Sequence, residues 1–153
     1  MERTLILIKP DAIARGLAGT ILNRFESKGL KIIGMKMLQL DDSLLGEHYS
    51  HLVDKPFFPG IAAFMESLPV LAICLEGKEA VDVCRNLCGA TNARQAAPGT
   101  IRGDLSLSMQ CNLVHASDST VNAITEVARF FKPEELFAYQ APLLSYLLAA
   151  DEQ

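Results

Sequence analysis

The sequence lacks a basic excess and a long apolar run, and each absence narrows what the chain can do. It carries 14 Lys and Arg residues against 18 Asp and Glu, for a formal net charge of −4. This balance argues against binding to nucleic acid, which requires a basic surface for the phosphate backbone. The longest uncharged stretch, Leu136 to Ala150, is shorter than the ~20 apolar residues of a membrane-spanning helix and contains Gln140 and Pro142. Leu5 to Ile8 is too short for the ~7–15-residue apolar region of a signal peptide. We therefore expect a cytoplasmic protein without a membrane segment.

Cysteine is scarce, and its positions do not suit a metal site. No CxxC pair or nearby histidine completes a ligand set. Half of the residues are hydrophobic, so a core can form without disulfides. We expect free thiols at all four positions, which are Cys74, Cys84, Cys88 and Cys111.

Repeats, low-complexity tracts and Ser/Gly linkers are also missing, so nothing marks a domain boundary. A chain of 153 residues that is 50% hydrophobic is enough for one core but too little for two domains of ordinary size. We expect a single domain over residues 1–153.

The pattern of apolar residues alternates between strands and helices. Short apolar or alternating segments predict strands at residues 4–9, 30–40, 70–75 and 113–115. Helical spacing and capping residues predict helices at about 17–28, 41–51, 60–67 and 78–87. A further helix is predicted after Ser119, with an apolar face made of Val121, Ile124, Ala128 and Phe131. Residues 90–104 are predicted to form a long polar loop, of a length that is often functional. Four strands interleaved with helices indicate an α/β sandwich with helices over a four-stranded sheet.

His115 lies where a predicted strand ends and a helix begins, followed closely by Ser117 and Asp118. The unpaired N–H groups at a helix start favour an anion, and neutral imidazole is a competent nucleophile near pH 7. Glu126, on the helix that follows, is the carboxylate available to orient the ring. Spacing alone leaves two interpretations open: a nucleophile, or an ordinary hydrogen-bonded histidine at a strand end.

The other two histidines, His48 and His51, are three apart on a predicted helix beside Glu47. This spacing suits a pair of metal ligands. No third ligand is visible in the sequence, so we interpret the pair as part of an exposed helix surface.

Three cations could form an anion site if the fold brings them together. Lys9 closes the first strand, Arg85 lies on the helix after the 70–75 strand, and Arg102 stands in the polar loop. Each alone is explained by a solvated surface charge. Converging, they would form a clamp for a polyphosphate, because the planar Arg fork matches phosphate oxygens.

Ordered motifs surround His115 and cover nearly the whole chain. They are KPD at 9–11, RGL at 15–17, KPFFPG at 55–60, GATN at 89–92, APGTIRGD at 97–104, NLVHASDS at 112–119 and FKPEEL at 131–136. This set resembles nucleoside diphosphate kinase over roughly residues 3–137, which leaves 138–153 as a C-terminal tail. In that family a histidine takes the γ-phosphate of a nucleoside triphosphate and then, in a ping-pong reaction, phosphorylates a nucleoside diphosphate.

The resemblance implies a role for each site residue. His115 would be the phosphorylated histidine, Glu126 and Ser117 would position its ring, and Tyr49 would lie beside it. The remaining set would bind the nucleotide: Lys9 and Asn112 at the sugar hydroxyls and the transferring group, Arg85, Thr91 and Arg102 at the phosphates, and Phe57 and Ile61 at the base.

The resemblance also implies broad base tolerance and a metal that arrives with the substrate. A clamp made of Phe57 and Ile61 offers stacking and apolar area but reads no hydrogen-bond edge, so purines and pyrimidines should both be accepted. Mg²⁺ would be carried by the nucleotide phosphates, so no protein ligands for a metal are expected.

Several positions depart from the family pattern. Ala116 stands where the family usually has Gly after its histidine, Gln110 and Cys111 replace Gly and Arg, and Ala93 replaces a Pro. The Ala116 methyl restricts the backbone beside the nucleophile unless φ is negative. This leaves an alternative function, a ferredoxin-like nucleotide sensor or scaffold without turnover. Ala93 bears on the stability of an oligomer more than on catalysis.

The resemblance implies a ferredoxin-like sandwich with an antiparallel four-stranded sheet, assembled as tetramers or hexamers built from dimers. The apolar C-terminal stretch could lie at a subunit contact or fold back on its own core. Its apolar residues are Leu143, Leu144, Leu147 and Leu148.

Overall fold

The computed structural model describes residues 1–140 and 144–152, and in this part the strands form one four-stranded sheet. The strands are β1 (Glu2–Ile8), β2 (Lys31–Leu38), β3 (Val70–Gly77) and β4 (Val114–Ala116), in the order β2-β3-β1-β4. All pairs are antiparallel. The helices are α1 (Pro10–Ala14), α2 (Ala18–Ser27), α3 (Asp42–His48), α4 (Phe58–Glu66), α5 (Ala80–Cys88), η1 (Ala93–Gln95), α6 (Ile101–Leu105), α7 (Thr120–Phe130), η2 (Pro133–Glu135) and α8 (Leu144–Leu147). The predicted ferredoxin-like sandwich is confirmed.

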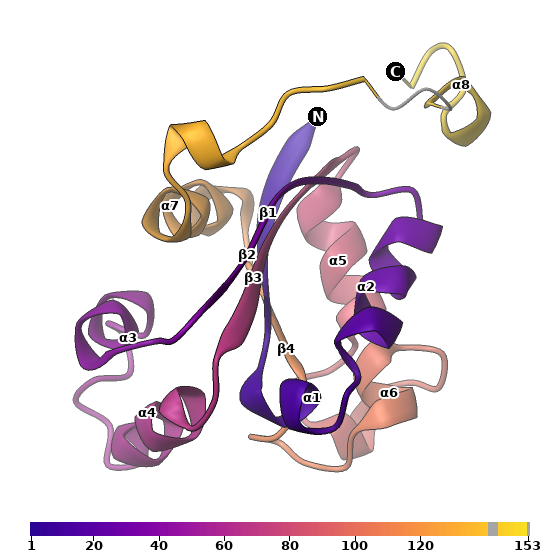
Figure 1. Ribbon diagram of the computed structural model, residues 1–153. Coiled ribbons are helices and arrows are strands. Elements are labelled where there is room, and N and C mark those ends of the chain that lie inside the picture. Colours follow the sequence, from indigo (N-terminus) through magenta and orange to yellow (C-terminus); the bar gives the residue numbers. More distant parts are fainter. Residues whose placement is uncertain (141–143, 153) are drawn as a thin grey trace.

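Helices cover both faces of the sheet, and the alternation of side chains along β1 separates two apolar cores. Figure 1 shows α3, α4 and α7 on one side of the strands and α2, α5 and α6 on the other. Ile6 and Ile8 point into the core beneath α2 and α5, whereas Leu5 and Leu7 point into the core beneath α7. All four are fully buried. This is the period of two that a strand buried on both faces requires.

The buried face of α7 differs from the predicted one. Val121 and Ile124 are 75% and 68% exposed, and Ala128 is exposed as well. Of the predicted face only Phe131, which directly follows the helix, is buried. The helix instead buries Ala123, Val127 and Phe130 against β1. Positions i, i+4 and i+7 form this stripe, and it is the rotation of α7 that also brings Glu126 round to β4. The prediction followed the most hydrophobic side chains, but the contacts with the sheet decide which stripe is buried.

The segment predicted as a loop over residues 90–104 is partly helical. It contains η1, and α6 starts within it, capped by Thr100, whose Oγ1 accepts a hydrogen bond from the Gly103 amide at 3.0 Å. A side chain at Gly103 would collide with the Ala97 carbonyl oxygen, so the loop closes tightly here. A helix of five residues is too short to show a helical repeat of apolar residues, and a cap adds none. The sequence pattern therefore did not reveal α6. Similarly, α3 ends at His48 rather than continuing to His51.

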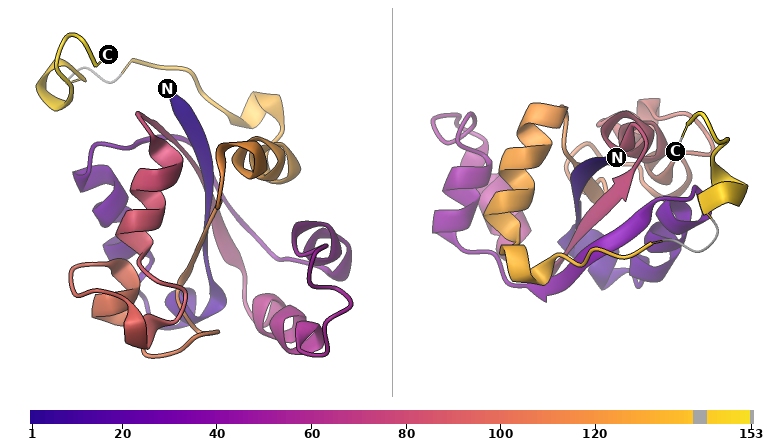
Figure 2. Two further views of the ribbon diagram at one scale, coloured as in Figure 1. Left: turned by 180° about the vertical axis from the view of Figure 1, so that it is seen from behind. Right: turned by 90° about the horizontal axis from the view of Figure 1, so that it is seen from above.

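The chain after η2 runs along the β2 side of the sheet toward α2, as Figure 2 shows. The Phe137 amide donates to the Ile33 carbonyl at 2.7 Å, and the Tyr139 hydroxyl donates to the Ile32 carbonyl at 2.6 Å. In α8, Leu147 is 51% exposed and lies near Gly29. The predicted burial of Leu143 falls outside the described residues, as does that of the Leu144 side chain. In the described ranges, no helix has the length and apolar content needed to cross a bilayer.

The thiols are unpaired, as expected. Cys74, Cys84 and Cys88 are buried, and Cys111 is exposed. Burial raises the pKa of the Cys74 and Cys88 thiols to about 11, so both stay protonated and behave as small apolar groups in the core.

The corrected face of α7 leads to a stability prediction. Replacing the buried Val127 with Ala should lower the free energy of unfolding by about 2 kcal/mol, because two methyl groups leave the core beside Leu5 and Leu7. The matched change Ile124→Ala, on the exposed side of the helix, should alter it by no more than ~0.5 kcal/mol. Urea denaturation of both variants measures the difference, and a larger loss for Ile124→Ala would contradict the observed rotation of α7.

Candidate functional site

The site is built around His115, the middle residue of β4. Because side chains alternate along a strand, Val114 and Ala116 face the core beneath α5, and His115 faces α7 on the other side. The strand pairs with β1 through Leu7 and His115, which fixes its height in the sheet. The His115 side chain is 20% exposed, so the ring is held by its neighbours yet reachable from solvent.

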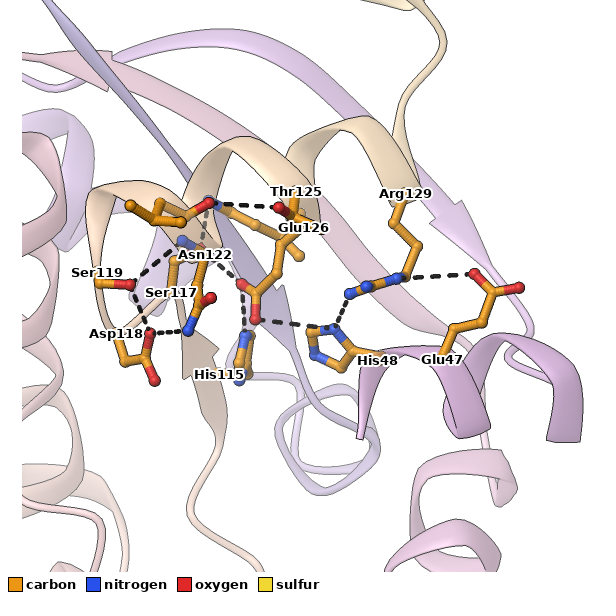
Figure 3. Close-up of polar contacts among 12 residues, drawn as sticks. Glu47, His48, His115, Ser117, Asp118, Ser119, Asn122, Thr125, Glu126 and Arg129 are labelled. Atoms are coloured by element: carbon orange, nitrogen blue, oxygen red, sulfur yellow. Dashed lines mark hydrogen bonds and ion pairs between the residues drawn. The ribbon is translucent and has the colours of Figure 1, made fainter. Parts of the chain in front are cut away.

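A carboxylate contacts the ring of His115, and a hydroxyl holds that carboxylate in place (Figure 3). Glu126 Oε2 lies 3.0 Å from His115 Nε2 and accepts a hydrogen bond of 2.6 Å from Ser117 Oγ. The Ser117 oxygen in turn accepts from the Leu5 amide at 3.2 Å. This chain of contacts ties α7 to β1 at the position of the histidine.

The charge state of Glu126 determines which nitrogen of His115 is free. Burial raises the pKa of Glu126, but the hydrogen bond and charge of His115, followed by the Ser117 hydroxyl, outweigh it and bring the pKa to about 2. An ionised carboxylate only accepts hydrogen bonds, so the proton on His115 lies on Nε2. The Nδ1 lone pair lies on the side of the ring away from Glu126 (Figure 3), and within the described part of the chain the hydrogen bond of the ring is made through Nε2.

Most of the predicted site residues line one cleft of about 420 Å³ with His115. They come from separate elements: Lys9 ahead of α1, Tyr49 after α3, Arg85 on α5, Thr91 ahead of η1, Arg102 on α6 and Asn112 ahead of β4. Phe57 and Ile61 are not in this lining. Phe57 is 56% exposed at the start of α4, and Ile61 packs against the core beneath α7.

Positive charge gathers in the cleft although the chain as a whole is acidic. Burial, followed by the charge of Arg102, lowers the pKa of Lys9 to about 8. Burial also lowers the pKa of Arg102, and the charge of Arg85 contributes to the shift. Cations that depress one another's pKa in a cleft indicate a place for an anion.

Hydrogen bonds to the backbone hold Arg102 in place. Its Nη1 donates to the Gly89 carbonyl at 2.7 Å, its Nη2 to the Val114 carbonyl at 2.7 Å and its Nε to the Asn112 carbonyl at 3.2 Å. Since a guanidinium has five N–H donors, further donors remain for a ligand. The Asn112 side chain accepts from Lys9 Nζ at 2.7 Å, so these residues form one preorganised group.

His48 was predicted to lie on an exposed helix surface, and this was wrong. It is 6% exposed, and its ring lies edge-on to that of His115 with the centroids 4.5 Å apart. Its partner in the predicted pair, His51, is exposed. Leu45 is buried on the same helix three residues earlier, so the i, i+3 spacing from that apolar residue was the signal that could have revealed it.

Three possible metal ligands lie within 4.8 Å of one another, which is close enough to suggest a metal site. They are His48, His115 and Glu126. However, the Arg129 guanidinium lies 3.5 Å from His48 Nδ1. The guanidinium therefore faces the nitrogen that a metal ion would have to bind, so the geometry does not favour a divalent ion.

The backbone around the histidine accommodates the departures from the family pattern. Ala116 lies in an extended strand and not in the left-handed region, so its methyl group imposes no strain. The strain is carried instead by Leu113, which has φ +74° and is fully buried. Its amide donates to Asp11 Oδ2 at 3.1 Å, which holds the turn into β4.

Comparison with known proteins agrees with this geometry. The sequence model described as nucleoside diphosphate kinase matches residues 2–136. A nucleoside diphosphate kinase of Parabacteroides distasonis is 53% identical over 152 residues, covering 99% of both chains. One from Pyrococcus horikoshii is 52% identical and covers 90% of each. The structure of a halophilic nucleoside diphosphate kinase from Halobacterium salinarum in complex with CDP superposes with a TM-score of 0.93 at 43% identity, over 96% of this chain and 98% of that one.

This chain belongs to the nucleoside diphosphate kinase family. It is a phosphotransferase that moves phosphate between nucleotides, and the predictions of family, fold and enzyme class are confirmed. The alternative of a nucleotide sensor or scaffold without turnover is not favoured.

The burial of His48 leads to a prediction about pH. Burial, followed by the nearby charge of His115, lowers the pKa of His48 to about 3. As pH falls below the usual value of about 6.5, the unfolded chain takes up this proton first, so the folded state loses stability by up to ~1.4 kcal/mol per pH unit. The contribution of neutral His48 to the free energy of unfolding is fully present above pH 6.5 and is lost progressively as the pH falls toward 3.

The variant His48→Phe keeps a ring in the core but cannot titrate. Its free energy of unfolding should therefore fall less steeply than that of the parent protein between pH 6.5 and 4.5. Urea denaturation at a series of pH values gives the two slopes. Equal slopes would show that His48 is not held neutral in the folded protein.

Proposed function

We propose that His115 is the phosphorylated residue and that its Nδ1 is the attacking atom. The supporting observation is the alignment of its ring: Nε2–H is engaged by Glu126, and Nδ1 is left free beside a cleft that contains Lys9, Arg85 and Arg102. The bond between Nδ1 and the γ-phosphorus forms as the bond from that phosphorus to the β,γ-bridging oxygen breaks. The bond electrons leave with the nucleoside diphosphate. In the second half-reaction a terminal phosphate oxygen of another nucleoside diphosphate attacks the phosphorus and regenerates His115.

Glu126 stabilises the positive charge that the ring acquires when Nδ1 is phosphorylated. Its carboxylate faces Nε2–H in the resting enzyme and need not move, so little reorganisation accompanies the reaction. Ser117 holds the same carboxylate oxygen and thereby sets the angle of the ring. These two are positioning residues for the nucleophile.

The cations act on the phosphates, and Tyr49 lies beside the histidine. Phosphoryl transfer has a loose, anionic transition state, so fixed donors and in-line placement supply most of the catalysis. Arg85, Thr91 and Arg102 would hold the phosphates that do not react, and Lys9 and Asn112 would bind the sugar hydroxyls and the transferring group. Burial, followed by the charge of Glu126, raises the pKa of Tyr49, so its hydroxyl stays a donor beside the histidine.

The base would lie against Phe57 and Ile61, at the mouth of the site on α4. The exposed Phe57 ring has a free face for stacking, and stacking accepts any base. The Halobacterium salinarum relative was solved in complex with CDP, which supports nucleotide binding by this chain as well. Exchange rates measured with several diphosphates test this tolerance, and a strict preference for one base contradicts it.

The metal would be Mg²⁺, carried by the nucleotide phosphates. Lys9, Arg85 and Arg102 line the cleft, and such cations suit phosphate oxygens. The carboxylate nearest to His115, that of Glu126, accepts hydrogen bonds from His115 and Ser117. Mg²⁺ bound to the phosphates would neutralise part of the charge on the leaving group.

The chain would act as a homo-oligomer, a tetramer or hexamer built from dimers. Edge strand β2 exposes Met35 and Met37, at 51% and 59%, and such apolar surface favours burial against another chain. The unpaired thiols are consistent with the reducing cytoplasm. The mass of the native assembly tests the proposed oligomer. Cell fractionation tests the proposed cytoplasmic location.

Labelling tests the role of His115. Incubation with γ-labelled ATP and Mg²⁺ should label the protein in an acid-labile, base-stable form, as expected for phosphohistidine, and omission of Mg²⁺ should abolish the label. His115→Gln should remove it, while Cys111→Ser, at an exposed thiol, serves as the matched control and should label normally. Labelling that persists in His115→Gln would overturn the proposal.

A further inference from the structure

Glu126 and Arg129 stand three residues apart on α7, the spacing at which opposite charges on a helix meet. Arg129 nevertheless turns elsewhere. Its Nε lies 3.8 Å from Glu47 Oε2, and its Nη1 lies 3.5 Å from His48 Nδ1. Within residues 1–140, where all of these side chains are described, no ion pair joins Arg129 to Glu126.

The ring of His48 stands where that ion pair would otherwise form. Its Nδ1 is 3.5 Å from the guanidinium and 3.9 Å from Glu126 Oε1, and in Figure 3 both contacts meet at this one nitrogen. The side chain is 1% exposed. It is held edge-on by the rings of Tyr49, His115 and Phe130, with centroids 4.7, 4.5 and 5.2 Å away.

The neighbours of His48 also determine its tautomer. Arginine can only donate, and it is nearer to Nδ1 than the carboxylate is, so Nδ1 accepts and the proton lies on Nε2. Among the described residues, Nε2 is one of the few buried side-chain polar atoms without a hydrogen-bond partner. An unsatisfied buried group is destabilising, and its presence beside the nucleophile points to a function for the rest of the ring. The lowered pKa of His48 agrees with a neutral ring at physiological pH.

We propose that His48 is a positioning residue for phosphoryl transfer: it engages Arg129 and keeps the guanidinium from pairing with Glu126, which leaves the carboxylate to His115. An arginine on Glu126 would neutralise the carboxylate and draw it away from Nε2–H. The ring would lose its orientation, and the positive charge of the phosphorylated histidine would lose its counter-charge. This inference rests on the proposed roles of His115 and Glu126.

Two substitutions at position 48 distinguish the contribution of the Nδ1 acceptor from that of the stacked ring. His48→Phe keeps the stacked ring but removes the acceptor that faces Arg129. His48→Asn removes the ring but places an amide oxygen close to the position of Nδ1. If the acceptor matters, kcat for phosphate exchange should fall ~10–100-fold in the Phe variant, as on losing a partner of a catalytic group. The Asn variant should retain most of its kcat, and KM for the nucleotide should change little in either.

Removal of the arginine provides the decisive control. Arg129→Leu alone should leave kcat within about twofold, and combined with His48→Phe it should restore most of the lost rate, because no guanidinium remains to pair with Glu126. A double variant as slow as His48→Phe overturns the proposal, and so does full activity in His48→Phe. If the Phe variant does not fold, loss of kcat in a folded His48→Asn protein overturns it equally. Phosphohistidine labelling of the parent protein is measured in parallel, so a failure of the proposed function is recognised separately.

Discussion

The hydrogen bond of 3.0 Å between His115 Nε2 and Glu126 Oε2 is the contact on which the rest of the site depends. It determines the tautomer and leaves Nδ1 as the proposed nucleophile, and it would provide the counter-charge for a phosphorylated ring. The bond joins a three-residue edge strand to a helix, two elements that must be held at a fixed height and rotation. The two apolar cores hold β1, and pairing with β1 fixes the height of β4 in the sheet. The buried stripe of α7 fixes the rotation of that helix. Much of the core packing therefore serves to align two side chains.

Positively charged side chains gather in the cleft although the chain as a whole has a net negative charge. The chain has a net charge of −4, yet Lys9, Arg85 and Arg102 line the cleft that contains His115. The hydrogen bonds of Arg102 to three backbone carbonyls show how this is achieved, because they hold a buried cation that forms no ion pair with a carboxylate among the described residues. A carboxylate in that position would have neutralised the cation and blocked a phosphate. The carboxylate nearest to His115, that of Glu126, is engaged by His115 and Ser117.

The sequence was sufficient for the order of the strands and of the longer helices. The resemblance, carried by ordered motifs over nearly the whole chain, implied the antiparallel sandwich and the gathering of Lys9, Arg85 and Arg102 around His115. The sequence was not sufficient for the rotation of α7, where Ile124 is more hydrophobic than Ala123 and yet lies in solvent. Nor did it reveal His48, since burial of a histidine depends on neighbours from β4 and α7 that are distant in sequence. The helix within the 90–104 segment was missed for a related reason: a hydroxyl cap and a tight glycine contact stabilise it, and neither leaves an apolar period.

Nuclear magnetic resonance of the phosphorylated protein tests the central claim most directly. With only three histidines in the chain, ¹⁵N-labelled rings can be assigned by comparison with single substitutions at His48 and His51. Long-range ¹H–¹⁵N spectra should show phosphorus coupled to Nδ1 of His115 and the proton retained on Nε2. Phosphorylation at Nε2 would contradict the account, because that nitrogen is the one committed to Glu126.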